Sequence, residues 1–121
     1  MRSKVEITQT LYVLNRDEWR HWLAKHHQTE REVWLRFYKK GSGKTGVTYD
    51  AAVEEALCFG WIDSLVQRID DACYAQKFTP RKPNSVWSTS NKLRARQMIR
   101  EGKMVEAGRL TLPTELTKED A

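Results

Sequence analysis

Apolar and polar residues alternate along several stretches of the chain, as expected of strands in a sheet that has one covered face. The clearest stretch is residues 32–40, in which one side carries only apolar residues: Val33, Leu35 and Phe37. Weaker alternation at residues 8–14 and 73–79 predicts two further strands, and the run at residues 65–69 predicts a fourth.

Apolar residues at helical spacing predict three helices. Each is expected to begin after a side chain that accepts hydrogen bonds from the first backbone N–H groups: Asn15, Thr48 or Asp50, and Ser88. Glu18 is expected to complete a capping box with the first of these. The helices are expected to end near three residues: His27, Gly60 and Gly102. The order of elements predicts an α+β fold, with a small mixed or antiparallel sheet and helices packed on one face.

The length of 121 residues suits one domain, expected to span residues 1–110. Residues 111–121 are polar and acidic and are expected to form a loosely held tail. The N-terminus lacks the apolar segment of a secretory signal, and no apolar run approaches the roughly 18 residues that a bilayer-spanning helix needs. Cys58 and Cys73 do not form a CxxC pair and are interpreted as reduced thiols. These features predict a cytoplasmic protein.

The net charge of +5 is concentrated in one segment. Residues 81–103 carry seven basic residues and one acid, Glu101, which gives +6 and leaves −1 for the rest of the chain. A local positive charge indicates a local anionic partner. A solvated helix face with ordinary lysines and arginines explains the same charges, and the sequence leaves both interpretations open.

Short motifs for catalysis or metal binding are absent. The GSGKT run at residues 41–45 lacks the first glycine of a phosphate-binding loop, because Tyr38 stands there. His21 and His26 are five positions apart and diverge on a helix, so they do not form a metal-binding pair. No Ser-His-Asp or Cys-His set is suggested by local spacing. The sequence therefore predicts no catalytic residue, metal or cofactor.

The segment around Pro80 and Pro83 is different in kind, because it combines cations, an indole, serines and a capped basic helix. The candidate ligand-binding residues are the polar, basic and aromatic residues in and near this segment: Trp61, Asp63, Ser64, Arg81, Lys82, Ser85, Trp87, Ser88, Asn91 and Arg94. Asp63 is the expected partner of Arg81 or Arg94, since buried cations need hydrogen-bond partners.

The same region resembles a known family, the YdeI/OmpD-associated or bacteriocin-protection family. The resemblance covers about residues 9–108 and is strongest in these elements: Ala56 to Ser64, Pro80-Arg81, Ser85-x-Trp87-Ser88, Asn91, Arg94 and Gly102-x-Met104. It implies a bacterial cytoplasmic protein connected with resistance to bacteriocins or antimicrobial peptides, but no particular reaction and no role for a residue. Members of that family continue past the Gly-x-Met element, whereas this chain stops at Ala121, as a short or truncated member would.

Three hypotheses for function follow. The first is a non-catalytic binding domain for an anionic ligand, either a phosphorylated metabolite, an anionic lipid head group or nucleic acid. The second is an enzyme in which Asp63 is a general acid or base and Arg81 or Arg94 holds an oxyanion. The third is a purely structural polar cluster that ties the last helix to the sheet. The sequence favours binding over catalysis. A basic surface repels cationic peptides, so any direct contact with them is expected at the acidic residues 50–55.

Overall fold

The computed structural model describes residues 6–119. Its strands and helices follow in this order: β1 (Thr10–Leu11), α1 (Arg16–His26), β2 (Val33–Tyr38), α2 (Tyr49–Cys58), β3 (Trp61–Asp70), β4 (Cys73–Pro80), α3 (Thr89–Arg100), α4 (Glu106–Arg109) and α5 (Thr114–Glu119). The sheet order is β1-β2-β4-β3, with β1 parallel to β2 and the other pairs antiparallel. The predicted α+β class with a mixed sheet is therefore confirmed.

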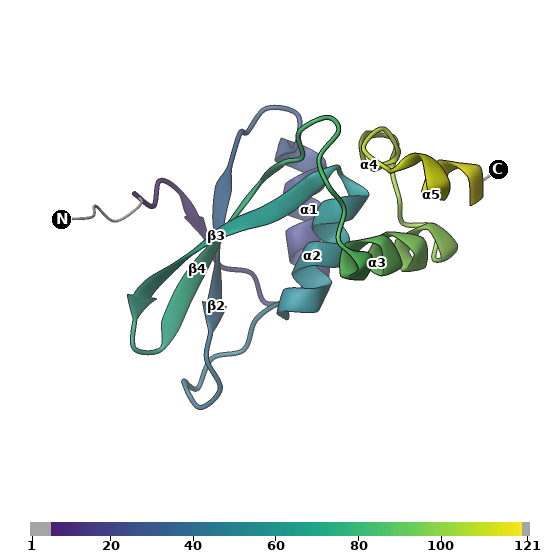
Figure 1. The fold of residues 1–121 in the computed structure, drawn as a ribbon. Helices are drawn as coiled ribbons and strands as arrows, with labels where there is room; N and C mark the ends of the chain where they lie inside the picture. Colours follow the sequence, from purple (N-terminus) through teal and green to yellow (C-terminus); the bar gives the residue numbers. More distant parts are fainter. Residues whose placement is uncertain (1–5, 120–121) are drawn as a thin grey trace.

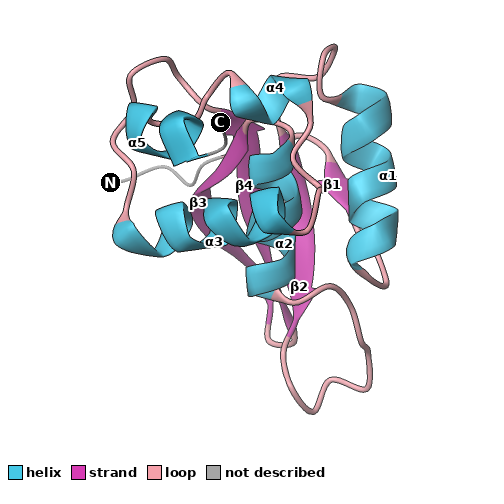
Figure 2. Ribbon diagram, turned by 90° about the vertical axis from the view of Figure 1, so that its right-hand side faces the viewer, coloured by secondary structure: helices cyan, strands magenta, loops and turns pink. Residues whose placement is uncertain are grey.

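The helices lie on one side of this sheet (Figure 1), and a view from the helical side shows α1, α2 and α3 in front of the strands (Figure 2). The core fills the space between the two layers. The predicted apolar side of β2, Val33, Leu35 and Phe37, faces it and packs with residues such as Trp19 and Phe78. Burial of these large apolar side chains is the main stabilising contribution.

Local capping sets the helix starts, as the sequence predicts. The Asn15 side chain accepts from Glu18 N at 3.0 Å, while Glu18 Oε1 accepts from Leu14 N at 2.7 Å. Thr48, rather than Asp50, caps α2, and Ser88 caps α3. Two expected chain reversals use left-handed glycines, with φ of 75° at Gly60 and 72° at Gly102. Glycine tolerates this conformation because it has no Cβ.

The C-terminal segment is packed around Glu115 and Leu116, which corrects the expectation of a loosely held tail at residues 111–121 as far as residue 117. Leu116 in α5 is completely buried, and Glu115 forms ion pairs with Lys92 at 2.9 Å and Arg96 at 4.0 Å. A Cβ on Gly60 would lie 2.7 Å from Ala107 O, so α4 approaches the end of α2 too closely for any other residue. Tertiary contacts thus hold a segment whose own polar composition predicts no structure; residues 120 and 121 lie outside the described residues.

None of the helices in the described part of the chain is long and apolar enough to cross a bilayer. Cys58 and Cys73 are both free and buried. Burial raises the pKa of the Cys58 thiol to about 11, since a buried thiolate would lose its hydration. This cysteine is therefore an apolar core residue at neutral pH.

Candidate functional site

Arg81 directly follows β4, and its backbone is fixed to the end of α2. Arg81 N donates a hydrogen bond to Gly60 O at 2.8 Å. The chain then turns, with Ser85 N donating to Lys82 O at 3.3 Å and Asn84 adopting a left-handed φ of 61°. Asparagine adopts this conformation more readily than most residues with a Cβ. The turn is therefore an ordered connection between β4 and α3.

The Arg81 side chain carries a charge that the protein does not neutralise. Its guanidinium lies over the Trp87 ring, 4.0 Å from the ring centroid, and Nη2 donates to Ser85 Oγ at 2.7 Å and Val86 O at 3.2 Å. Nε is buried without a hydrogen-bond partner, and none of the carboxylates whose side chains the structure describes forms an ion pair with Arg81. Burial lowers the pKa of the guanidinium, and the charge of Asp63 offsets this only in part. Such a site favours an added anion.

Two hollows meet at Arg81, Lys82 and Ser85. The first, called the Arg81 hollow, has a volume of about 380 Å³. Its lining includes these predicted site residues: Asp63, Arg81, Lys82, Ser85, Ser88 and Asn91. The second, called the Leu112 hollow, has a volume of about 320 Å³ and is lined by Trp87 and by residues 110–114 between α4 and α5. The structure thus places most of the predicted site residues around these two hollows. The sequence suggested this arrangement but did not establish it.

The start of α3 adds hydrogen-bond donors to the Arg81 hollow. Ser88 and Asn91 line it, and Ser88 Oγ accepts from Asn91 N at 3.1 Å. The first turn of α3 has no acidic residue, whereas those of α1 and α2 contain acids. The positive end of the helix dipole therefore reinforces Arg81 and Lys82.

Three predicted site residues line neither hollow: Trp61, Ser64 and Arg94. Trp61 is buried in the core, where its Nε1 donates to His27 O at 3.3 Å and its ring packs edge-on against Trp22. It cannot stack on a ligand, which corrects that expectation. Ser64 is exposed on β3, where its hydroxyl donates to Lys77 O at 3.4 Å, and it lines neither hollow. Of the three predicted residues on β3, only Asp63 lines the Arg81 hollow.

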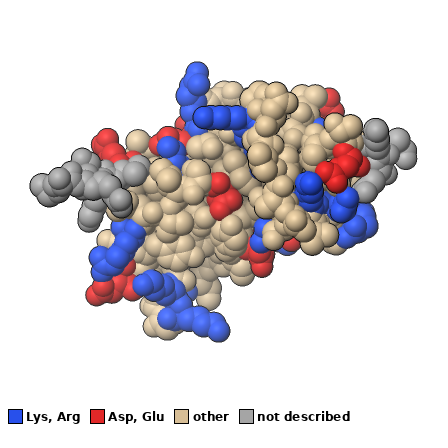
Figure 3. All heavy atoms as spheres, viewed as in Figure 1, with Lys and Arg blue, Asp and Glu red and all other residues tan. Residues whose placement is uncertain are grey.

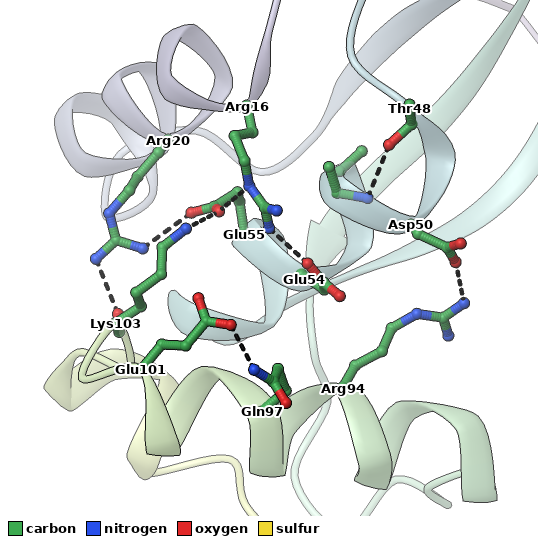
Figure 4. A network of polar contacts seen from close by, with 12 residues as sticks. Arg16, Arg20, Thr48, Asp50, Glu54, Glu55, Arg94, Gln97, Glu101 and Lys103 are labelled. Atoms are coloured by element: carbon green, nitrogen blue, oxygen red, sulfur yellow. Dashed lines mark hydrogen bonds and ion pairs between the residues drawn. The ribbon is translucent and has the colours of Figure 1, made fainter.

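Asp63 and Arg94 do not pair with the partners that the sequence suggested. Asp63 Oδ2 accepts from Tyr49 Oη at 2.9 Å and from Gln76 Nε2 at 2.7 Å. Burial and the bond to Asp63 raise the pKa of the Tyr49 hydroxyl. Arg94 instead binds Asp50 at 2.6 Å (Figure 4) and Asn91 Oδ1 at 2.9 Å. Arg94 thus joins α3 to α2 beside the Arg81 hollow and lines neither hollow.

Sequence reasoning missed a second polar cluster, centred on Glu55. This side chain is completely buried and accepts from Arg16 Nε at 2.7 Å, Arg20 Nη1 at 3.0 Å and the Lys103 ammonium (Figure 4). Burial alone would raise the pKa of Glu55, but the hydrogen bonds from Lys103, Arg20 and Arg16 outweigh it and lower the pKa. The i, i+4 spacing of the two arginines was a usable signal for a shared acidic partner.

The acids of residues 50–55 are each paired with a cation of the same chain. Besides buried Glu55, the carboxylate of Glu54 binds Arg16 at 2.5 Å and that of exposed Asp50 binds Arg94. These ion pairs reduce the negative charge of the edge that was expected to contact cationic peptides.

The GSGKT loop does not form a nucleotide site of the phosphate-loop kind. Residues 44–48 form neither helix nor strand, and α2 begins only at Tyr49, whereas a phosphate-binding loop leads straight into its helix. Lys44 lies over the Tyr38 ring, 4.8 Å from its centroid. No group of metal-binding side chains occurs among the residues that the structure describes.

Comparison with known proteins gives one match. Residues 11–111 match a family model described as a domain of unknown function, DUF8412. No curated protein and no solved structure matches the chain. Nothing in these comparisons links it to the YdeI/OmpD-associated family, and that resemblance stays a prediction.

Proposed function

We propose that this chain, which belongs to the DUF8412 family, is a non-catalytic domain that binds a compact oxyanion such as a phosphate group in the Arg81 hollow. The observation that carries the proposal is the half-buried Arg81 guanidinium without a carboxylate partner in the described part of the chain. Removing a charge from water costs free energy unless a counter-charge compensates it. A bound anion would supply that compensation.

The available donors favour a tetrahedral oxyanion over a planar carboxylate. A guanidinium binds carboxylates best through two parallel N–H groups. In Arg81 both N–H groups of Nη2 already donate to Ser85 and Val86, so they are not available for two parallel bonds to a carboxylate. What remains are the N–H groups of Nη1, the ammonium of Lys82, and the Ser88 hydroxyl and Asn91 side-chain amide at the start of α3, which come from separate parts of the lining. A phosphate offers oxygens in several directions and up to two negative charges.

The surface argues against a nucleic-acid strand as the main ligand. On the face drawn in Figure 3, Lys and Arg form separate groups with uncharged surface between them, rather than one continuous stripe. Trp61 is buried, and Arg81 covers one face of the Trp87 ring, which leaves at most the other face of this one indole for stacking. Lys92 and Arg96 on α3 pair with Glu115. A small phosphorylated compound fits these features better.

The enzyme hypothesis receives less support. Asp63 is the only carboxylate among the named residues of the Arg81 hollow, and its Oδ2 already accepts two hydrogen bonds. A general acid or base must bring a titratable group such as this carboxylate within hydrogen-bond reach of the substrate proton. The role in bacteriocin resistance that the resemblance implies would be indirect for a binding domain, because its basic site repels cationic peptides.

Calorimetric titration with inorganic phosphate at low salt tests the proposal. Replacing Arg81 by Gln removes charge-assisted hydrogen bonds worth about 1.5–3 kcal/mol, so the affinity should fall roughly 10- to 100-fold. Lys82→Gln should also weaken binding, by less. The matched control is Lys25→Gln, on the exposed surface of α1, which should leave the affinity unchanged.

Circular dichroism melting of each variant shows whether it is folded. The exposed side chain of Lys82 forms no hydrogen bond or ion pair within the described part of the chain, so Lys82→Gln keeps the test valid even if Arg81→Gln unfolds. Absence of any phosphate binding at low salt would refute the proposal, as would equal weakening by Lys25→Gln and Lys82→Gln.

A further inference from the structure

The Leu112 hollow adjoins the proposed anion site and has a lining of mixed character. It shares Arg81, Lys82 and Ser85 with the Arg81 hollow, and its other polar residues are Asn84, Thr111 and Thr114. Its apolar residues, here called the apolar wall, are Pro83, Trp87, Leu110, Leu112 and Pro113. Cations and an apolar wall therefore lie within one concave surface, as in sites for ligands with a charged head and an apolar body.

The apolar wall is fixed in place, although it lies outside regular elements. Leu112 N donates to Arg109 O at 3.2 Å, and the Thr111 hydroxyl donates to Gly108 O at 2.8 Å. On either side, α4 is held against the end of α2 at Gly108, and α5 is anchored by buried Leu116. A wall that is ordered before binding loses little conformational entropy when a ligand arrives.

Leu110 is unusually exposed for a residue at the edge of a concave surface. Its relative exposure is 77%, while the neighbouring Leu112 is half-buried and packs on the core. An exposed leucine alone needs no explanation. Next to Leu112, Pro113 and the cations of the anion site, it provides apolar area that a ligand body can cover.

We infer that the ligand is a phosphate monoester with an aromatic or short apolar body, its phosphate held by Arg81 and Lys82 and its body in the Leu112 hollow. This inference rests on the proposed function and names the class of ligand for that site. The volume of about 320 Å³ suits one ring or a short chain rather than a dinucleotide or a lipid tail. Apolar area removed from water then adds to the affinity that the phosphate provides.

Three probes separate the two claims: inorganic phosphate, methyl phosphate and phenyl phosphate, titrated calorimetrically into the intact chain. Phenyl phosphate is expected to bind about tenfold more tightly than methyl phosphate, because only its ring reaches the apolar wall. In nuclear magnetic resonance spectra, the ring current of bound phenyl phosphate should shift the amide signals of Leu110, Thr111 and Leu112. Methyl phosphate has no ring and should not shift them.

Leu110→Ser is the informative variant, since its exposed side chain contributes little to folding. It should remove most of the advantage of phenyl over methyl phosphate and leave the affinity for inorganic phosphate unchanged. The control is Leu93→Ser, an exposed leucine on α3 that lines neither hollow and should change nothing.

The possible results test the inference about the body of the ligand separately from the proposed function of anion binding. Equal binding of phenyl and methyl phosphate would overturn the inference while the anion site stands. An equal loss in Leu93→Ser and Leu110→Ser would also overturn it. Failure of all three phosphates to bind would remove the proposed function and, with it, the inference.

Discussion

The molecule contains two partly or fully buried charged sites, and they are balanced in opposite ways. Glu55 lies at the first, completely buried, with Arg16, Arg20 and Lys103 around it (Figure 4). Arg81 lies at the second, with a guanidinium that has aromatic, hydroxyl and carbonyl neighbours but no carboxylate partner among the described side chains. The first site is electrostatically complete, and the second is not.

This difference is the basis for proposing a structural role at one site and a binding role at the other. The Glu55 cluster joins α1, α2 and the turn after α3, and its charges compensate one another within the chain. At Arg81 the neighbouring groups offset the free energy of burial only in part, and the proposed anion would supply the missing counter-charge. Disturbing Glu55 should therefore change stability, and disturbing Arg81 should change affinity.

The largest expected effect is that of Glu55→Gln on stability. Removing this carboxylate leaves three cations around a buried site, and breaking a buried pair from one side costs about 3–5 kcal/mol. Because the cations are partly exposed, we expect about 3 kcal/mol, measured by urea unfolding. The control, Glu54→Gln, loses a more exposed partner and should cost less than about 1 kcal/mol. Equal costs for both variants would contradict a structural role for the cluster.

The same cluster should show itself in the pH dependence of stability. Its cations lower the pKa of Glu55, so the unfolded chain takes up a proton at higher pH than the folded chain does. The contribution is complete above the ordinary value of 4.5 and is lost as the pH falls below it through the folded-state pKa. The difference in unfolding free energy between the natural chain and Glu55→Gln should narrow below pH 4.5; a constant difference would contradict this.

A smaller effect on stability is expected for Arg81→Met. The change loses the bonds to Ser85 and Val86, but it also removes an uncompensated charge and keeps apolar contact with Trp87. These contributions oppose each other, so the unfolding free energy should change by no more than about 1 kcal/mol. A loss close to that of Glu55→Gln would make Arg81 a structural residue and remove the contrast between the sites.

The smallest effect is expected for Asp63→Asn, measured as phosphate affinity. Its carboxylate lines the Arg81 hollow and repels an anion there. An asparagine Oδ1 can still accept from Tyr49 and Gln76, so the fold is preserved. Binding should become about threefold tighter, since the hollow is open to solvent and the repulsion is screened. The control is the exposed Asp71→Asn; weaker binding by Asp63→Asn would indicate that Asp63 contacts the ligand directly.

A feature could be predicted from the sequence where it depends on residues that lie close together along the chain. The capping of α1 by Asn15 and of α3 by Ser88 involves residues three positions apart, which the sequence displays directly. The apolar side of β2 follows from alternation alone. By contrast, the sequence pattern does not distinguish an exposed Trp61 from a buried one. Only the packing of Trp22 against its ring shows that Trp61 belongs to the core.

The sequence by itself determined the α+β class, the helix starts and the segment that carries the cations, because side-chain period and capping act over a few residues. Tertiary structure alone decided which charges are balanced. Arg16 and Glu55 are 39 positions apart, and the wall at residues 110–114 reaches Arg81 only through the packing of α4 and α5. Coulomb interactions depend on distance in space and on burial, and neither quantity can be read from the order of residues along the chain.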